Sequence, residues 1–462
     1  MTYADDLRNR LKSEGRPLRI LGASGQLGYG IPTATFEKGL DRKPDMIGCD
    51  MGSVDIGPYS LGSGQVGTTP ASTHRDLRKV LLGARSIGVP LVIGTAGSAG
   101  AGPHLDATLD IIRDVAKREG LHFRLGSIRA DISRDAVKKA VAERRVREFD
   151  GGEPLTSAEV DAASHIVGQM GYSSFARAYE AGADVIIAGR ACDTAIFAAL
   201  PIVLGFPAGL SMHLAKIVEC ASLCCVPGGR DPILASLDNN GFELESMAEQ
   251  RMATPLSVAA HSLYEQSDPF YVYEPEGCLD VRSARYDAID QRRTRVSGAV
   301  WRDAQQISIK IEGARSMGYR AVLLAGVTDP RFIARQEQIF EEVKEVVRGL
   351  TCEDAPEDYN LFFRFYGVNG VLDHSNAPPP TEAFVLGECL APTPERALEV
   401  MRTTKQYLLH HGYPGRLSTG GNLAFPFTPP EVSVGPAFRF NIYHLMDVDA
   451  TDQFFPLSIE DL

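Results

Sequence analysis

The sequence contains few cysteines, and they lack the spacing of known cysteine sites. Eight cysteines are distributed over 462 residues, and no two form the Cys-x-x-Cys pair of zinc and redox sites. Their density is too low for a disulfide-stabilised scaffold, and a chain of this length buries a large core without cross-links. We therefore expect a protein with free thiols in a reducing cytoplasm.

The sequence also contains fewer basic residues than acidic ones. Lysine and arginine total 47 against 59 aspartates and glutamates, so the formal net charge is −12 at pH 7. No long run of basic residues offers the positive surface to which DNA or RNA binds. The sequence therefore predicts no nucleic-acid partner.

Long hydrophobic runs are missing as well. The most apolar window, residues 186–210, is interrupted by Arg190 and Asp193 and contains Pro201 and Pro207, which argues against a membrane-spanning helix. The opening residues are polar and acidic, whereas a secretory signal needs a basic head and an apolar stretch. We expect neither export nor association with a membrane.

The familiar catalytic and cofactor motifs are not found either. The sequence has no GxSxG elbow, HExxH helix, EF-hand loop or kinase signature. Gly22, Gly25, Gly28 and Gly30 do not have the GxGxxG spacing of dinucleotide-binding loops, and no GK[ST] ending follows them. The motifs therefore assign neither a cofactor nor a metal.

An alternation of short apolar runs, glycine-rich loops and amphipathic segments extends over residues 17–190. This rhythm predicts an α/β fold, in which βα units form a mostly parallel sheet with flanking helices. Expected strands lie at residues 17–21, 45–48, 91–94, 122–128 and 184–188. Expected helices begin at Pro32, Arg75, Pro103 and Thr156, the last reaching Val167, and one more covers residues 175–181.

The pattern changes beyond about Asp280. Apolar residues alternate at 307–311 and 361–365, which indicates antiparallel strands with one uncovered face. Helical spacing occurs at 332–348 and 394–410, and further strands are expected at 384–387 and 438–443. We therefore expect an α/β domain over residues 1–280 and an α+β domain over 281–462. The uncovered strand face predicts a homo-oligomer.

Four loops directly follow the expected parallel strands, at residues 22–30, 48–64, 94–106 and 188–194. Ligands of α/β sheets bind outside the carboxyl ends of such strands, so we expect these loops to line one cleft. Their glycines allow an anion to approach the backbone closely. The alternative is that the glycines only make tight turns.

Two of these loops carry candidates for acid–base chemistry. His104 stands at an expected helix start, where the helix dipole favours the neutral imidazole that accepts a proton; helix capping is the alternative. Asp106 lies in the first turn of the same helix, where a carboxylate is favourable whatever its function. Asp50 and Asp55, near a histidine, could also hold a divalent cation, although no established ligand spacing supports a metal site.

Arg190 is the candidate for binding an anion. It ends an apolar strand, where a buried guanidinium needs a partner, either Asp193 or a carboxylate or phosphate of the substrate. Cys192 is either a nucleophile or a small buried side chain. Arg230 and Arg416, each in a glycine-rich loop, are further anion-binding candidates.

Together these segments supply a base, an acid and an anion clamp. The expected catalytic residues are His104, Asp50, Asp106, Arg190 and Asp193. The expected substrate-binding residues are Gly25, Gly28, Tyr29, Asp55, Tyr59, Gly97, Gly100, Thr194, Arg230 and Arg416.

Several long strings carry a family resemblance. They include IGCDMGSVDIGPYSLGSG, GSAGAGPHLD, AGADVIIAGRACDTAIFAALP, TPLSVAAHSLYE and LHHGYPGRLSTGGNLAFPF. On these strings the chain resembles the acyclic terpene utilisation protein A family over nearly its whole length. That family is named from catabolic operons for citronellol and geraniol, whose neighbouring enzymes carboxylate and hydrate branched acyl-CoA thioesters. Some members have a small additional C-terminal domain or a separate small partner, so the resemblance implies that a small partner subunit can take part.

The resemblance and the strand-end residues together predict a cytoplasmic catabolic enzyme that acts on a small carboxylate or its acyl-CoA thioester. A lyase or hydratase step fits best, because proton abstraction beside a carbonyl needs one base and one electrophilic clamp but no cofactor motif. Two alternatives stay open. One is a hydrolase with metal-bound water at Asp50, His104 and Asp106, and the other is a non-catalytic subunit that binds acyl-CoA for partner enzymes.

Overall fold

Five short apolar strands form the centre of the first of two units into which the chain divides. The computed structural model describes residues 2–149, 151–264, 268–353, 355–372, 378–417 and 420–462. Its first unit comprises Met1–Arg315 and Phe440–Leu462, and its second comprises Ser316–Arg439. The parallel strands of the first unit follow the order β1 (Leu18–Ser24), β2 (Met46–Asp50), β3 (Leu91–Gly94), β7 (Val185–Ala188) and β4 (Arg124–Ile128).

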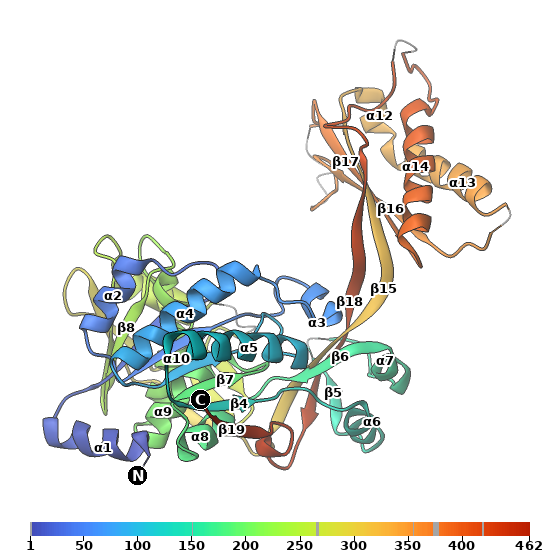
Figure 1. Cartoon of the computed structure of the whole chain (residues 1–462). Coiled ribbons are helices and arrows are strands. Elements are labelled where there is room, and N and C mark those ends of the chain that lie inside the picture. Colours follow the sequence, from blue (N-terminus) through green and yellow to red (C-terminus); the bar gives the residue numbers. More distant parts are fainter. Residues whose placement is uncertain (1, 150, 265–267, 354, 373–377, 418–419) are drawn as a thin grey trace. The chain divides into compact units, whose positions relative to one another are not determined.

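Helices cover both faces of these strands, because successive side chains point to opposite sides. Ile47 and Ile93 pack among the helices α2 (Thr33–Asp41), α4 (Pro70–Ser86) and α5 (Gly102–Glu119). Met46 and Val92 pack on the other face, among α1 (Tyr3–Glu14), α8 (Tyr172–Glu180), α9 (Asp193–Leu204) and α10 (Ala208–Val218). Figure 1 shows α4 and α5 on one side of the sheet and α8 and α9 on the other. Burial on both faces explains why the central strands are continuously apolar.

Antiparallel strands extend this parallel centre at both edges. Beyond β1 lie β8 (Ile233–Asp238), β9 (Gly241–Ser246), β13 (Arg293–Ser297) and β12 (Arg285–Ala288), and beyond β4 lies β19 (Leu457–Asp461). The expected α/β character is confirmed, but the sheet is mixed, so the expectation of a mostly parallel sheet is wrong. The reason is that β8 and β9 form a hairpin through Asn239 and Asn240, and hairpin partners need no helical crossover.

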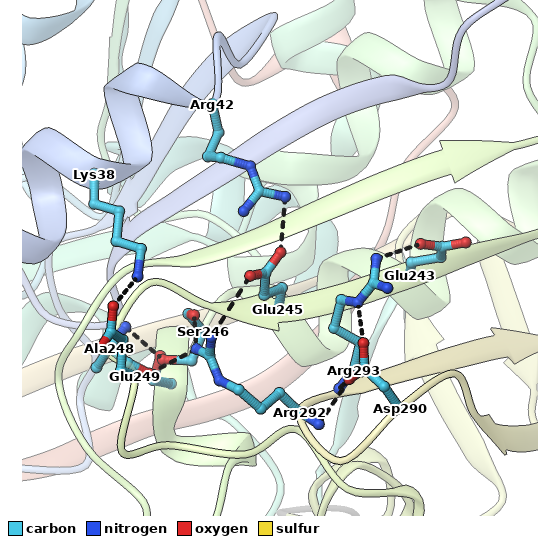
Figure 2. A network of polar contacts seen from close by, with 11 residues as sticks. Lys38, Arg42, Glu243, Glu245, Ser246, Ala248, Glu249, Asp290, Arg292 and Arg293 are labelled. Carbon is cyan, nitrogen blue, oxygen red and sulfur yellow. Dashed lines mark hydrogen bonds and ion pairs between the residues drawn. The ribbon is translucent and has the colours of Figure 1, made fainter.

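A network of charged side chains ties this antiparallel extension to α2, as Figure 2 shows. Arg42, at the carboxyl end of α2, lies 2.8 Å from the Glu245 carboxylate on β9. Arg292, just before β13, donates hydrogen bonds of 3.0 Å to the carbonyls of Ser246 and Ala248. Because the partners come from three separate segments, the network fixes the extension beside the helix.

A small antiparallel sheet of three strands lies against α10. Its strands are β10 (Tyr271–Glu274), β11 (Gly277–Asp280) and β14 (Val300–Asp303). Gly209 of α10 has no room for a side chain, because a Cβ there would lie 2.6 Å from the Ala299 carbonyl oxygen. The helix and the sheet therefore approach closely. Two short helices lie in the preceding segment, the 3-10 helix η1 (Ala221–Cys224) and α11 (Pro255–Ser262).

One expected helix forms only in its first half. Thr156 caps α7 by accepting a hydrogen bond from the Glu159 amide, but α7 covers only Ser157–Ala162. The next residues form β6 (Ala163–Gly168), which pairs antiparallel with β15 (Ser308–Val327) and places Ile311 opposite Gly168. The expectation of a helix through Val167 is therefore wrong, because pairing with a distant strand overrides the local helical pattern.

The remaining elements of the first unit surround its edges. They are α3 (Tyr59–Ser63), α6 (Arg134–Ala142), β5 (Val146–Glu148), the 3-10 helix η2 (Thr451–Gln453) and the last part of β18 (Glu431–Asp447). β5 pairs with β18, placing Arg147 opposite Leu445.

The second unit packs three helices on one face of an antiparallel sheet. Its elements are α12 (Pro330–Ala334), α13 (Gln336–Thr351), β16 (Asn360–Tyr366), β17 (Ala383–Ala391), α14 (Pro394–His410) and parts of β15 and β18. Phe340 of α13 stacks on Phe363 of β16, with 4.5 Å between the ring centroids. The helices and strands expected at 332–348, 361–365 and 394–410 are confirmed, the first as two consecutive helices.

The two units divide within β15 and again before Phe440, whereas we expected a domain boundary at residue 280. Residues 281–315 stay with the first unit because their strands pair with β9, β11 and β6. Among the described residues, no helix is long and apolar enough to cross a membrane.

Candidate active site

A cavity of about 980 Å³ lies in the first unit, beside the carboxyl end of β7. Its wall comes from the loop after β2, the segment after β7, α10, the turn between β10 and β11, and the strands β14, β15 and β18. The charged residues of the wall are Asp55, Arg147, Arg190, Asp193, Lys216, Glu219, Glu274, Arg302, Asp303 and Lys310. Acids and bases thus face one space, which suits proton transfer on a charged substrate.

Arg190 is buried at the end of β7, and its main partner is Glu312. The Arg190 Nε atom lies 2.8 Å from Oε2 of Glu312, whereas Nη1 is 4.0 Å from the Asp193 carboxylate. Lys310 Nζ lies 3.0 Å from Oε1 of the same Glu312. Burial opposes all three charges, but ion pairing outweighs it, so the pKa of Arg190 is raised and that of Glu312 is lowered. The cavity therefore contains two stable cations beside one anion.

Glu274, at the end of β10, is the side chain best suited to carry a proton. Its Oε1 atom accepts a 2.5 Å hydrogen bond from the Thr194 hydroxyl, while its buried Oε2 atom has no hydrogen-bond partner among the described residues. Burial raises the pKa of Glu274 to about 7, although the neighbouring Cys192 thiol and the Thr194 hydroxyl oppose the shift. A carboxyl group with such a pKa both donates and accepts a proton readily at neutral pH.

A second buried pair lies on α10. Lys216 Nζ is 2.6 Å from Oε1 of Glu219, and both side chains are about 5% exposed. Burial raises the pKa of Glu219 above the ordinary range, although the Lys216 charge opposes the shift. Burial and the charge of Asp193 likewise raise the pKa of Asp50 at the end of β2. These carboxyl groups therefore hold protons more readily than solvent-exposed ones.

Cys192, one of two cysteines among the described wall residues, lacks the lowered pKa of a nucleophilic cysteine. Burial raises the pKa of the Cys192 thiol well above its usual value, and the charge of Glu274 adds to the shift. A nucleophilic cysteine needs a lowered pKa. Cys192 therefore lines the cavity as a neutral thiol.

Four of the expected site residues line the cavity, namely Asp55, Arg190, Asp193 and Thr194. They belong to the loops at 48–64 and 188–194. Among the described residues, neither the loop at 22–30 nor the loop at 94–106 contributes to the wall. The cleft that we expected from four loops is therefore formed by two of them, together with helix and strand residues from later in the chain.

His104 acts as a helix cap in this structure. Its Nδ1 atom accepts a hydrogen bond from the Ala101 amide, and its Nε2 atom is 3.1 Å from the Ser60 carbonyl and 3.2 Å from the Gln65 carbonyl. These partners assign the proton to Nε2. Burial lowers the pKa of His104, which favours the neutral form as expected, but both ring nitrogens are engaged by the backbone. The capping alternative explains this residue.

The expected anion-binding glycines serve contacts within the protein. The amides of Gly28 and Gly30 donate hydrogen bonds to the buried Asp76 carboxylate at 3.1 and 2.7 Å. A Cβ on Gly25 would lie 2.8 Å from Cys220 Cα. Gly97 and Gly100 meet residues of the same edge equally closely: a Cβ on Gly97 would stand 2.7 Å from His104 Cβ, and the Gly100 carbonyl accepts the Arg190 amide at 3.1 Å. These contacts support the alternative interpretation, in which the glycines make tight turns and do not bind an anion.

The other candidates lie away from the cavity wall. Asp106 is exposed and pairs with Arg129 at 2.5 Å. Arg230 stacks over the Tyr29 ring at 5.5 Å, so these two candidates bind each other. The Tyr59 hydroxyl donates to the Gln65 side chain at 3.2 Å.

Arg416 is in the second unit, where it donates to Asn422 at 2.7 Å and to the Gly420 carbonyl at 2.9 Å. These bonds give it a role in its own glycine-rich loop. Its expected role in substrate binding therefore has no support from the cavity.

Two of the three residues of the metal alternative, His104 and Asp106, have separate partners. Asp106 pairs with Arg129, and the ring nitrogens of His104 are held by backbone groups. In the part of the chain that the structure describes, no group of three or more His, Cys, Asp or Glu side chains could hold a metal ion. Contacts within the protein therefore account for Asp106 and His104.

Sequence reasoning missed Glu274, Lys216, Lys310 and Glu312. Lys310 and Glu312 alternate with buried isoleucines on β15, which reads as an ordinary strand with a solvated face. The sequence feature that could have indicated Glu274 is its position at the end of a short strand, just before the turn to the next strand. That signal is too common to select a residue.

Of the comparisons with known proteins, the one with protein families gave a match. Residues 72–225 and 244–431 match the family described as acyclic terpene utilisation family protein AtuA. The comparisons with curated proteins and with solved structures gave no match. Since the matched residues cover most of the chain, the protein belongs to the acyclic terpene utilisation family AtuA, and this membership suggests a role in acyclic terpene utilisation.

Proposed function

We propose that this cavity catalyses a lyase or hydratase step on a small carboxylate or its acyl-CoA thioester, with Glu274 as the proton carrier. The observation that carries the proposal is the state of this side chain. One carboxyl oxygen of Glu274 is held by Thr194, the other is buried without a partner among the described residues, and its pKa is near 7. Such a group lacks a structural partner for its proton and is poised to exchange it with a ligand.

The proposed step is addition of water to an α,β-unsaturated acyl group. The Glu274 carboxyl donates its proton to the carbon next to the carbonyl, while a water oxygen bonds to the next carbon. The surplus proton of that water then passes to the Glu274 carboxylate, so the enzyme returns to its starting state. In the reverse direction the Glu274 carboxyl gives its proton to the hydroxyl group, which leaves as water, and the resulting carboxylate removes the proton from the carbon next to the carbonyl.

The cations of the cavity supply the electrostatic part of the step. Negative charge develops on the acyl oxygen as the carbon–carbon double bond is polarised. Arg190 and Lys310, both stabilised by Glu312, provide fixed positive charge on the cavity wall. Preorganised charge of this kind stabilises such a transition state more than water does.

Deuterium incorporation into simple acyl compounds tests the proposal. The protein is incubated in deuterated water with 3-methylbut-2-enoate and 3-hydroxy-3-methylbutanoate, and separately with their coenzyme A thioesters. Proton NMR then follows label and hydration at the carbon next to the carbonyl. We expect labelling by the wild type, and about two to four orders of magnitude less by Glu274→Gln, the usual contribution of a positioned acid or base.

The matched control is Glu276→Gln. Glu276 is a neighbouring, largely buried glutamate whose Oε1 atom accepts hydrogen bonds from Ser173 and whose Oε2 atom, like that of Glu274, has no partner among the described residues, but it is not among the described residues of the cavity wall. This variant should label at close to the wild-type rate. Equal labelling by Glu274→Gln and wild type would refute the role of Glu274, and ligand binding without any labelling would support the non-catalytic alternative.

A further inference from the structure

The most unusual feature of the cavity wall is a buried carboxylate behind it that joins two cations. Glu312 is fully buried on β15. Its Oε2 atom receives Arg190 Nε at 2.8 Å, and its Oε1 atom receives Lys310 Nζ at 3.0 Å and Arg190 Nη2 at 3.4 Å. Arg190 and Lys310 line the cavity. One carboxylate therefore orients two cations toward the same space.

The two cations keep hydrogen-bonding capacity for a ligand. An ammonium group has three N–H donors and a guanidinium has five, and Glu312 can accept only some of them. The Lys310 ammonium is held from the side by aromatic rings, with Nζ 4.2 Å from the Tyr443 ring centroid and 5.3 Å from that of Phe149. The Phe149 ring attracts the cation without accepting a strong hydrogen bond, whereas the Tyr443 side chain also hydrogen-bonds with it.

The two cations of this cluster share one buried carboxylate and have a further acid at longer range. Glu312 supplies one negative charge against the two positive charges of Arg190 and Lys310. A further acid, Asp193, forms a long ion pair of 4.0 Å with Arg190 Nη1, so it offsets part of the remaining positive charge without accepting a hydrogen bond at that distance. Lys216, on the same cavity, is paired with Glu219 at 2.6 Å.

The outer cations of the wall are already paired. Arg302 donates to Asp280 at 2.8 Å, and Arg147 bonds to Asp447. Two acids, Asp55 and Asp303, also face the cavity. A polyanion such as the phosphorylated part of coenzyme A needs several available cations, and the described wall does not offer such a set. The charge pattern favours a ligand with a single negative charge.

We propose that Arg190 and Lys310 bind the carboxylate of a free monocarboxylic acid, and that Glu312 is the residue that positions both cations. This inference rests on the proposed function for the location of the site and narrows its substrate class from the two forms given there. Arg190 and Lys310 contact the ligand, whereas Glu312 acts through them. Without the buried carboxylate, the two like charges would repel each other across the site.

Binding of a simple probe tests the inference separately from catalysis. Isothermal titration calorimetry measures the affinity of the wild type for 3-methylbut-2-enoate and for its uncharged amide, and competition by coenzyme A without an acyl group. We expect the carboxylate to bind at least about tenfold more tightly than the amide, and coenzyme A not to displace it. Equal affinity for the amide, or displacement by coenzyme A, would overturn the inference, as would no carboxylate binding at millimolar concentration.

Matched variants locate the anion. Lys310→Met and Glu312→Gln should each weaken carboxylate binding at least about tenfold and leave the weak amide binding unchanged, while Lys310→Arg should restore most of the affinity. Arg302→Met, which removes a cavity cation already paired with Asp280, is the control and should bind the carboxylate as the wild type does. Equal weakening by Arg302→Met would indicate a general charge effect and reject the proposed pair.

Two outcomes separate this inference from the proposed function. Carboxylate binding that depends on Lys310, with labelling that does not depend on Glu274, would refute only the catalytic proposal. Labelling that depends on Glu274, with affinity that Lys310→Met does not change, would refute only the anion site. If Glu312→Gln does not fold, as judged by its melting curve, the half-buried Lys310 variants still decide the question.

Discussion

Two buried side chains of the first unit show how partners decide what a titratable residue does. His104 and Glu274 both have pKa values shifted toward the neutral form by burial. His104 has backbone partners at both ring nitrogens, whereas one oxygen of Glu274 has none among the described residues. A shifted pKa marks burial in both cases, and the combination of unmet hydrogen-bonding capacity with a place on the cavity wall is what points to chemistry at Glu274.

The shifted pKa of Glu274 predicts a pH-dependent gain of stability in Glu274→Gln. The folded pKa of about 7 lies above the ordinary value of 4.5, so between these values the folded state holds a proton that the unfolded state has lost. The wild type therefore loses stability as pH rises from about 4.5 to 7. Glutamine has no such dependence, so the variant should gain about 1–3 kcal/mol relative to the wild type at pH 8 compared with pH 4.

Urea unfolding of both proteins at several pH values measures this difference. The Glu276→Gln variant serves as a comparison, because burial also raises the pKa of Glu276 and a smaller change of the same sign is expected. A difference in unfolding free energy between Glu274→Gln and wild type that stays constant from pH 4 to pH 8 would show that Glu274 titrates normally in the folded protein.

His104→Ala should reduce stability and leave the chemistry intact. The substitution removes the cap of α5 and takes the His104 donor from the buried Ser60 carbonyl and from the carbonyl of the exposed residue Gln65. We expect the free energy of unfolding to fall by about 2–4 kcal/mol, because the cap and the hydrogen bonds to the carbonyls are lost together. Thermal melting measures the loss, and deuterium labelling per folded molecule should stay within a few-fold of the wild type. A loss of labelling by orders of magnitude in a normally stable variant would return His104 to the catalytic residues.

At the scale of elements, the loops after the parallel strands are fixed by contacts with each other. Gly100 has φ +68°, and a Cβ there would overlap the backbone nitrogen of Arg190. Gly120, at the other end of α5, has φ +63° and open space around it. The two glycines share a backbone conformation and differ in their surroundings. A comparison of substitutions at the two positions therefore distinguishes the cost of backbone strain from the cost of steric overlap.

Gly100→Ala should therefore be much more damaging than Gly120→Ala. The left-handed conformation alone costs an alanine about 1–2 kcal/mol, which is the full expected effect at Gly120. At Gly100 the overlap adds to this cost and displaces the start of the segment that carries Arg190, so carboxylate binding should weaken as well. Chemical denaturation and probe titration of both variants measure the two effects. Equal stability losses with unchanged affinity would show that the loop yields without moving Arg190.

Local sequence patterns predicted the helices and strands whose formation does not depend on pairing with a distant segment. The apolar strands at 91–94 and 184–188 and the helix from Pro394 to His410 carry their own signals, because burial on both faces or on one helical face repeats within a few residues. β6 and the β8–β9 hairpin were missed, since their strand character depends on β15 and on each other. Pairing with distant segments is not visible in a local pattern.

The candidate site shows the same division. Arg190 was identified because a charge at the end of an apolar strand needs a partner, and that argument is local. Its actual partner, Glu312, lies on β15 far along the chain. Sequence spacing offered Asp193 instead, which is 4.0 Å away. The loops of the expected cleft were likewise taken from one sheet edge, whereas the cavity also uses α10, β10 and β15.

At the scale of the whole molecule, the sheet of the second unit has one face that its helices leave uncovered. Phe363 and Phe365 of β16 pack against α13 or its neighbours, so the alternate residues Phe362 and Tyr366 point the other way. With Phe384 of β17, these rings are 37–44% exposed. Such a contiguous set of exposed rings on a sheet marks an interaction surface.

The same face also contains a buried carboxylate that pairs with two arginines. Glu388 is buried between Arg320 and Arg364, with its Oε1 atom 2.6 Å from Arg320 Nε. Glu388 neutralises one of the two guanidinium charges, so this cluster keeps one net positive charge, and the expected contact rests on the exposed rings around it. A twofold arrangement brings identical patches together, and the exposed rings then bury one another.

We therefore expect a homo-oligomer that forms through the uncovered face of the second unit. Phe362→Lys should place like charges opposite each other across the twofold contact and lower the mass in solution to that of one chain, 50.0 kDa. Val346→Lys is the matched control, because Val346 is a similarly exposed apolar residue, 39%, on α13 rather than on the sheet face. Light scattering across micromolar concentrations measures the masses of all three proteins. A wild-type mass near 50.0 kDa would reject the oligomer, and an equal effect of Val346→Lys would place the contact on the helices instead.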